Sequence, residues 1–143
     1  MLDTTNSPRP RCLVAEDQAI IGMMMEIDLN DAGYEIIGPF ASCSEALGWL
    51  GQATPDFALI DYKLADGACI ELARELKQRD VPFAVLSGFV DEDARRRPEF
   101  VDAPWLTKPV SAHALKHVLA SLYPVPRSDL RQTKRRQAAP AQV

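Results

Sequence analysis

The stretch Phe57-Ala58-Leu59-Ile60-Asp61 places four consecutive apolar residues directly before a carboxylate. An apolar run of this length, without polar alternation, is typical of a strand that is buried on both faces of a parallel sheet. Such a strand needs helices above and below it, since only they can cover both faces. The run therefore predicts a strand of an α/β sheet that carries Asp61 at its carboxyl end.

Segments with the length and apolar spacing of helices separate this strand from other strand candidates. Ser42 and Glu45 form a capping box, which predicts a helix that runs to about Leu50. Ser111 is a suitable N-cap for the last helix. Strands are expected at residues 12–15, 34–37, 57–60, 83–86 and 101–106, and helices at 18–31, 43–50, 69–76, 91–100 and 112–122. The β-α order occurs five times, which predicts a doubly wound α/β fold with a parallel sheet.

Length and composition indicate one globular domain with short polar ends. The chain has 143 residues, of which 47% are hydrophobic and 25% charged, the ordinary mix for a folded domain. We expect a disordered segment at residues 1–10, a packed domain at 11–123 and a disordered tail at 124–143. No apolar stretch approaches the roughly 18 residues of a membrane span, and residues 1–10 lack a signal-peptide core, so we expect a cytoplasmic protein. Three cysteines without a CxxC pair give little support to a disulfide scaffold or a zinc ribbon.

The charge is distributed unevenly between the expected domain and the tail. Residues 1–123 carry 11 Lys and Arg against 19 Asp and Glu, whereas residues 124–143 carry five basic residues against one acidic residue. An acidic domain does not attract nucleic acid by its charge, so nucleic acid is not an expected partner. The simplest interpretation of the tail is a solvated end.

Polar residues follow the strand candidates at their carboxyl ends. Glu16 and Asp17 follow the first strand, Asp61 the third, Ser87 the fourth and Lys108 the fifth. Because carboxyl ends of parallel strands meet at one edge, we expect these side chains to converge there. Three clustered carboxylates repel one another, and a hard cation such as Mg²⁺ relieves that repulsion. Asp61 could then attack a phosphorus atom while the metal, the lysine and the serine hydroxyl neutralise the phosphoryl oxygens.

Four short blocks at these strand ends resemble the signature blocks of response-regulator receiver domains, over about residues 11–122. The blocks are Val14-Ala15-Glu16-Asp17, Leu59-Ile60-Asp61, Leu86-Ser87-Gly88 and Leu106-Thr107-Lys108-Pro109. The resemblance implies a flavodoxin-like (βα)5 fold with strand order 2-1-3-4-5. Residues 82–90 also resemble in part the single-domain receivers that carry a Phe-Ala-Thr-Gly block. We therefore expect a stand-alone receiver without an output domain, as a monomer or a weak dimer.

The resemblance also implies the role of each site residue. Asp61 would accept a phosphoryl group from a histidine of a sensor kinase or of a histidine phosphotransfer protein. Mg²⁺, or Mn²⁺ in its place, would be held by Glu16, Asp17, Asp61 and the backbone carbonyl of Lys63. Lys108 would pair with the phosphate and precede a cis peptide bond, which is accessible before proline.

Switching in this family involves Ser87 and an aromatic residue. Ser87 would move toward the phosphoryl group, which shifts the protein between two states. The aromatic position falls on Trp105, which is bulkier than the usual Tyr or Phe, so a switch and a static packing residue both stay open. Phe89 is the alternative aromatic. The side chain of Lys63 would either shield the phosphorus from water or be a solvated lysine.

Several other residues are better explained by structure than by chemistry. Met23, Met24 and Met25 fit a helix that packs in the core or contacts a partner, and this helix is a common kinase-docking face in the family. His113 and His117 are spaced i, i+4, but no third metal ligand accompanies them. Cys43 and Cys69 occupy core-type helix positions.

Two other function classes deserve comparison with the receiver. An aspartate phosphatase of the haloacid dehalogenase type also uses an Asp at a strand end, but it needs an acid two residues later, where Lys63 stands. A receiver-like module that no longer takes phosphate would not need Glu16, Asp17, Asp61 and Lys108. We therefore expect a signalling protein that catalyses only its own phosphorylation and dephosphorylation, and no enzyme for a separate substrate.

Overall fold

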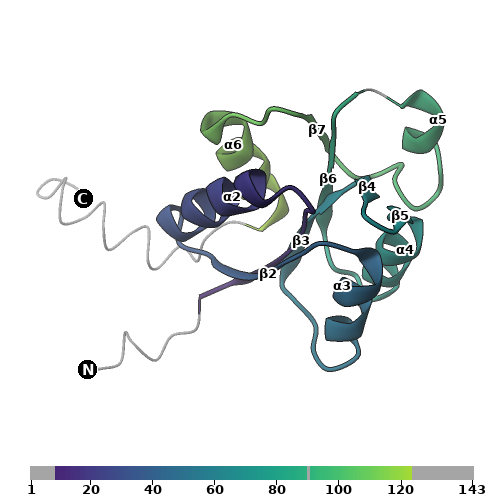
Figure 1. The fold of residues 1–143 in the computed structure, drawn as a ribbon, viewed down its shortest axis with the longest axis horizontal. Helices are drawn as coiled ribbons and strands as arrows, with labels where there is room; N and C mark the ends of the chain where they lie inside the picture. Colours follow the sequence, from purple (N-terminus) through teal and green to yellow (C-terminus); the bar gives the residue numbers. More distant parts are fainter. Residues whose placement is uncertain (1–8, 90, 124–143) are drawn as a thin grey trace, which may run out of the picture.

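The computed structural model describes residues 9–89 and 91–123, which form a parallel sheet between two layers of helices (Figure 1). The sheet has the order β2-β1-β3-β6-β7, and every neighbouring pair in it is parallel. Its strands are β1 (Arg11–Ala15), β2 (Glu35–Phe40), β3 (Phe57–Asp61), β6 (Phe83–Ser87) and β7 (Trp105–Thr107). Since β6 and β7 are its fourth and fifth strands along the chain, the expected order 2-1-3-4-5 and the flavodoxin-like fold are confirmed.

Helices cover both faces of the sheet. They are α2 (Ala19–Asp31), α3 (Cys43–Leu50), α4 (Ile70–Gln78), the single-turn α5 (Glu92–Arg95) and α6 (Ala112–Leu122). Side chains of β3 alternate between two cores: Leu59 packs with residues of α2 and α6, and Ile60 with residues of α3 and α4. Figure 1 shows these helix pairs on opposite sides of the sheet. The whole of β3 is buried, as its apolar run predicts.

Side-chain caps fix where two helices begin. The Glu45 backbone N–H donates to Ser42 Oγ at 3.1 Å, which is the serine half of the capping box. Glu45 Oε1 accepts from the Ala41 N–H at 3.1 Å, one residue before the N-cap, and not from the Ser42 N–H that the full box would use. Ser111 Oγ accepts from the Ala114 N–H at 3.0 Å and starts α6. Both serines are therefore N-caps as predicted, although the glutamate of the predicted capping box accepts from Ala41 instead of Ser42.

The region around residues 91–106 differs from the sequence prediction. The expected ten-residue helix is only α5, because Pro98 cannot continue a helix and the chain turns so that Phe100 enters the core. The expected strand at 101–106 is reduced to β7 (Trp105–Thr107). Pro104 has no N–H to donate to a sheet, although its carbonyl oxygen accepts from the Val85 N–H at 2.9 Å.

A short hairpin directly after β3 was not predicted. It pairs β4 (Lys63–Leu64) with β5 (Gly67–Ala68) in antiparallel fashion. Asp66-Gly67 is a turn-forming dipeptide, and Gly67 has a φ of 119°, which favours glycine. This dipeptide is the sequence signal that could have revealed the hairpin.

At the amino-terminal side, the described residues begin at Arg9, before β1. Pro10 is buried, and its carbonyl oxygen accepts from the Glu35 N–H at 2.8 Å. Of the end segments expected at residues 1–10 and 124–143, residues 1–8 and 124–143 lie outside the described residues. Within the described ranges, no helix combines the length and the apolar character that crossing a membrane requires.

Two glycine substitutions should change stability in opposite directions. Gly38 has a φ of 108°, and a Cβ there would lie 2.7 Å from the Val14 carbonyl oxygen, so Gly38→Ala should lower the free energy of unfolding by about 2 kcal/mol. Gly48 lies inside α3 with open space around its Cα, so Gly48→Ala should raise that free energy by about 0.5–1 kcal/mol. Urea denaturation measures both, and equal effects of the two substitutions would contradict the backbone placement of Gly38.

Candidate functional site

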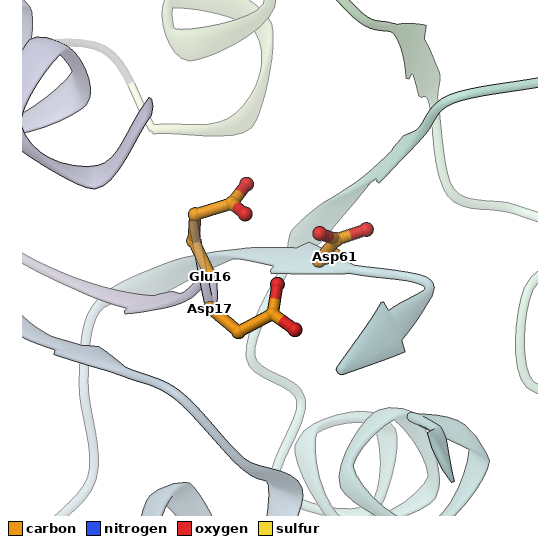
Figure 2. A group of neighbouring side chains, drawn as sticks. All are labelled: Glu16, Asp17 and Asp61. Carbon is orange, nitrogen blue, oxygen red and sulfur yellow. The ribbon is translucent and has the colours of Figure 1, made fainter. Parts of the chain in front are cut away.

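Three carboxylates from two paired strands meet at the carboxyl edge of the sheet. Glu16 and Asp17 follow β1, and Asp61 ends the neighbouring β3. One oxygen atom of each side chain lies within 4.8 Å of the others, and Figure 2 shows the three carboxylates grouped at this edge. Glu16 and Asp61 are buried, whereas Asp17 is exposed. The convergence expected from the strand ends is therefore present in the structure.

Lys108 reaches this cluster from the other side of β3. The Lys108 backbone N–H donates to the Ser87 carbonyl oxygen at 2.8 Å, which fixes the residue beside the end of β6. Its Nζ lies 2.6 Å from Asp61 Oδ2 and 3.0 Å from Glu16 Oε1. The Lys108-Pro109 peptide bond is cis, as the resemblance implied. Two buried carboxylates thus share one ammonium group.

Burial and crowding shift the ionisation of these groups. Burial raises the pKa of Asp61 to about 6, the hydrogen bond from Lys108 opposes this, and the charge of Glu16 adds to it. Burial alone would lower the pKa of Lys108, but the hydrogen bonds to Asp61 and Glu16 outweigh it and raise that pKa. The cluster therefore holds Lys108 charged and makes the ionised form of Asp61 less favourable than it is in an exposed aspartate.

The donor set of this cluster fits a divalent cation. Glu16 Oε1 is buried and accepts no hydrogen bond within the described chain, although Lys108 Nζ lies 3.0 Å away. A buried oxygen atom without a hydrogen bond is costly unless another positive partner reaches it. Mg²⁺ prefers carboxylate oxygens as ligands and usually keeps several of its waters. Asp17 is exposed, so an ion bound by the three carboxylates would still be in contact with solvent. Glu16, Asp17 and Asp61 could therefore hold Mg²⁺.

Ser87 is buried beside the cluster, but its hydroxyl group is engaged elsewhere. Ser87 Oγ donates to the Phe89 carbonyl oxygen and accepts from the Phe89 N–H at 3.2 Å. The Phe89 side chain is 57% exposed. The hydroxyl must release the Phe89 carbonyl before it can donate to a phosphoryl oxygen, so the movement expected of Ser87 stays a prediction.

Trp105 is part of an aromatic cluster. Its ring centroid lies 5.6 Å from that of Tyr62 and 5.5 Å from that of Phe100. The guanidinium carbon of Arg95 lies 5.8 Å from the Trp105 ring centroid. An inward swing of this side chain would break these contacts. The packing interpretation therefore describes this state of the protein, while a switching role stays a prediction.

The remaining candidate residues lie apart from any metal-type cluster. His113 and His117 are exposed on α6, and within the described chain the metal-type group of three or more residues is Glu16, Asp17 and Asp61. The methionine run divides: Met25 is buried, while Met23 and Met24 are exposed.

The three cysteines are free and buried. Burial raises the pKa of Cys43 to about 11 and raises the pKa of Cys12 and Cys69 as well. Thiols of this kind stay protonated at neutral pH, in agreement with a packing role.

A doubly wound sheet with an acidic cluster and a lysine at its carboxyl edge is the arrangement expected of a receiver domain. The family profile described as "Response regulator receiver domain" matches residues 12–120. The chain belongs to this family, and with it to the two-component signalling proteins.

Relatives and solved structures agree with this assignment. The transcriptional regulatory protein PdtaR of Mycobacterium tuberculosis is 34% identical over 103 residues, which are 71% of this chain and 50% of PdtaR. The chain thus spans about half the length of the curated relatives it matches. The solution structure of SdrG from Sphingomonas melonis Fr1 is similar with a TM-score of 0.67 and 29% identity, over 80% of this chain and 96% of SdrG. The receiver domain of the PhyR response regulator from Erythrobacter litoralis gives a TM-score of 0.71 and 25% identity, over 80% of this chain and 90% of that one.

The raised pKa of Asp61 predicts a pH dependence of stability in the metal-free protein. The folded-state value of about 6 lies above the unfolded value of about 4, so the folded state binds the proton more tightly. The free energy of unfolding should therefore fall as the pH rises from about 4 to about 6. The loss should be of the order of 2 kcal/mol, and urea titrations in EDTA measure it.

The matched variant Asp61→Asn cannot ionise at this position and should lack that fall. Mg²⁺ at pH 7 should stabilise the wild type more than the variant, because binding to the folded state adds to its stability. Parallel pH profiles for the two proteins would contradict the burial and crowding of Asp61.

Proposed function

We propose that this chain is the phosphoacceptor domain of a two-component phosphorelay and that Asp61 receives the phosphoryl group. The observation that carries the proposal is the position of Asp61 Oδ2, 2.6 Å from Lys108 Nζ and in the same cluster as the Glu16 and Asp17 oxygens. The phosphodonor is a phosphohistidine of a sensor kinase or of a histidine phosphotransfer protein. The regulated output is a change in protein–protein contacts.

In the transfer step, an Asp61 oxygen atom attacks the phosphorus atom of the phosphohistidine. The new P–O bond forms an acyl phosphate, the P–N bond breaks, and its electron pair returns to the imidazole nitrogen. Lys108 is already within ion-pair distance of the attacking carboxylate and can pair with the incoming phosphoryl oxygens. Glu16, Asp17, Asp61 and the Lys63 carbonyl would hold Mg²⁺, which would supply further positive charge for those oxygens.

The ammonium group of Lys108 has to change partners during this reaction. Before transfer it donates to Asp61 Oδ2 and to Glu16 Oε2, at 2.6 Å and 3.2 Å. Once Asp61 is phosphorylated, its carboxylate charge is replaced by phosphoryl charge farther from the backbone, which a long and mobile lysine can follow. Lys108 therefore stabilises the site both before and after phosphorylation.

Two other functions receive less support from the site. A phosphatase of the haloacid dehalogenase type needs a carboxylate two residues after the nucleophile, and the exposed Lys63 occupies that position. A binding module that takes no phosphate would have no use for two buried carboxylates that share one lysine. We propose that the protein acts only on its own phosphorylation. The stand-alone arrangement, the monomeric or weakly dimeric state and the cytoplasmic location stay predictions.

Incubation with acetyl phosphate and Mg²⁺ tests the proposal directly. The wild type should gain one phosphoryl group by mass spectrometry of the intact protein, and Asp61→Asn should gain none because it lacks the nucleophilic oxygen. Beryllofluoride with Mg²⁺ should bind the wild type and should not bind Asp61→Asn. Equal phosphorylation of both proteins would assign the phosphate to another residue, and no phosphorylation or beryllofluoride binding in either would favour the binding module.

Lys63 should control the lifetime of the aspartyl phosphate. It stands two residues after Asp61, and its long side chain can cover the phosphorus atom and hinder the attack of water. Lys63→Ala should therefore lose phosphate several-fold faster than the wild type when ³²P release is followed, whereas Lys77→Ala, a control in the last turn of α4, should not. Equal lifetimes would show that Lys63 is only a solvated lysine.

A further inference from the structure

The β4–β5 hairpin follows Asp61 after a single residue and is fastened at its base. The Tyr62 N–H donates to the Leu86 carbonyl oxygen at 2.8 Å, and the Tyr62 carbonyl oxygen accepts from the Cys69 N–H at 2.9 Å. Leu64 inserts its side chain into the core. These contacts hold the start of the hairpin, which includes Lys63, close to the end of β3.

The tip of the hairpin is fastened separately, to the start of α3. Asp66 Oδ1 accepts from the Cys43 backbone N–H at 2.8 Å, and Asp66 Oδ2 accepts from the Ser44 N–H at 3.1 Å. Next to it, the Ala65 N–H donates to the Ala41 carbonyl oxygen at 3.2 Å. One carboxylate thus connects the loop after the phosphoacceptor strand to a helix that begins 23 residues earlier.

These contacts complete the hydrogen bonding at the start of α3. The first N–H groups of a helix have no partner inside it. Ser42 Oγ satisfies the Glu45 N–H, and the side chain of Asp66 satisfies the N–H groups of Cys43 and Ser44. Ser42 acts from within its own segment, whereas Asp66 acts from the hairpin, so the two caps stabilise the same helix end from different parts of the chain.

The carboxylate of Asp66 is well suited to this contact. It is exposed, and the hydrogen bond from the Cys43 N–H is the main cause that lowers its pKa. The start of a helix also attracts negative charge through its dipole. Asp66 is therefore ionised at neutral pH, and both of its oxygen atoms are available as acceptors.

A hairpin of two residues per strand is too short to hold its shape alone, because even longer isolated hairpins are marginal in water. Without Asp66, two described hydrogen bonds would still join the hairpin to the start of α3: the Ala65 N–H to the Ala41 carbonyl oxygen, and the weak bond from the Cys43 thiol to the Ala68 carbonyl oxygen at 3.8 Å. The position of Lys63, on the first strand of the hairpin, would then vary more.

We propose that Asp66 is a positioning residue for the phosphorylation site. By clamping the hairpin tip to α3, it holds the Lys63 backbone carbonyl and side chain in place beside Asp61. The inference rests on the proposed function, because it concerns the same metal and phosphate site. Asp66 itself acts only through Lys63 and does not touch the reacting atoms.

Asp66→Ala and Ser42→Ala form a matched pair for the test. Each removes a side-chain cap from the start of α3, so both should lower the unfolding temperature by a similar amount. Only Asp66→Ala removes the contact to the hairpin. Asp66→Asn keeps one carbonyl oxygen as an acceptor and should be intermediate.

Three measurements separate positioning from stability. In metal-free protein, hydrogen exchange of the Ala65 amide should be faster in Asp66→Ala than in Ser42→Ala. The Kd for Mg²⁺, from titration calorimetry, should rise about tenfold in Asp66→Ala and stay at the wild-type value in Ser42→Ala. The phosphorylated lifetime should shorten only in Asp66→Ala, since Lys63 then shields the phosphorus atom less well.

The outcomes distinguish this inference from the proposed function. If the wild type takes no phosphoryl group, the proposed function fails, whatever the variants do. If the wild type is phosphorylated and the two alanine variants change the Mg²⁺ Kd and the lifetime equally, Asp66 is only a helix cap and the inference is overturned.

Discussion

Two buried carboxylates, Glu16 and Asp61, share the single ammonium group of Lys108 at the carboxyl edge of the sheet. This arrangement leaves negative charge in a place from which water is largely excluded, and such a site is expensive unless a cation or a reaction uses it. The raised pKa of Asp61 is the direct result. The fold has to be strong enough to hold these groups together against their repulsion.

The sheet provides that strength. β1 and β3 pair in parallel from Cys12 with Phe57 to Ala15 with Ile60, and all the residues of these pairs are fully buried. The ends of both strands are therefore fixed relative to each other. The two cores on either side prevent the strands from sliding, because a shift by one residue would exchange the side chains of the two faces. Lys108 is held beside these ends because its backbone N–H donates to the carbonyl oxygen of Ser87, the last residue of β6. Each charged group is thus attached to a rigid strand end, while the hairpin beside Asp61 depends on a contact to α3.

The sequence allowed the parallel sheet and the residues of the cluster to be predicted, because apolar runs and strand-end polar residues are local patterns. The strand order, in contrast, was implied by the resemblance to receiver domains. The exact ends of α5 and β7 did not follow from the sequence. Pro98 and Pro104 are local limits on a helix and a strand, but the packing of Phe100 in the core sets the course of the chain between them. The hairpin was missed although Asp66-Gly67 marks a turn, because two-residue strands have no periodicity to detect. The contact of Asp66 with α3 could not be predicted at all, since it depends on how two distant segments pack.

The most direct test of the cluster is paramagnetic NMR with Mn²⁺, which binds ligands of the same type as Mg²⁺. We expect substoichiometric Mn²⁺ to broaden the backbone amide signals of residues 15–17 and 61–63 first and an excess of Mg²⁺ to restore them. Broadening centred on His113 and His117, or none at the ends of β1 and β3, would contradict a shared metal and phosphate site around Asp61.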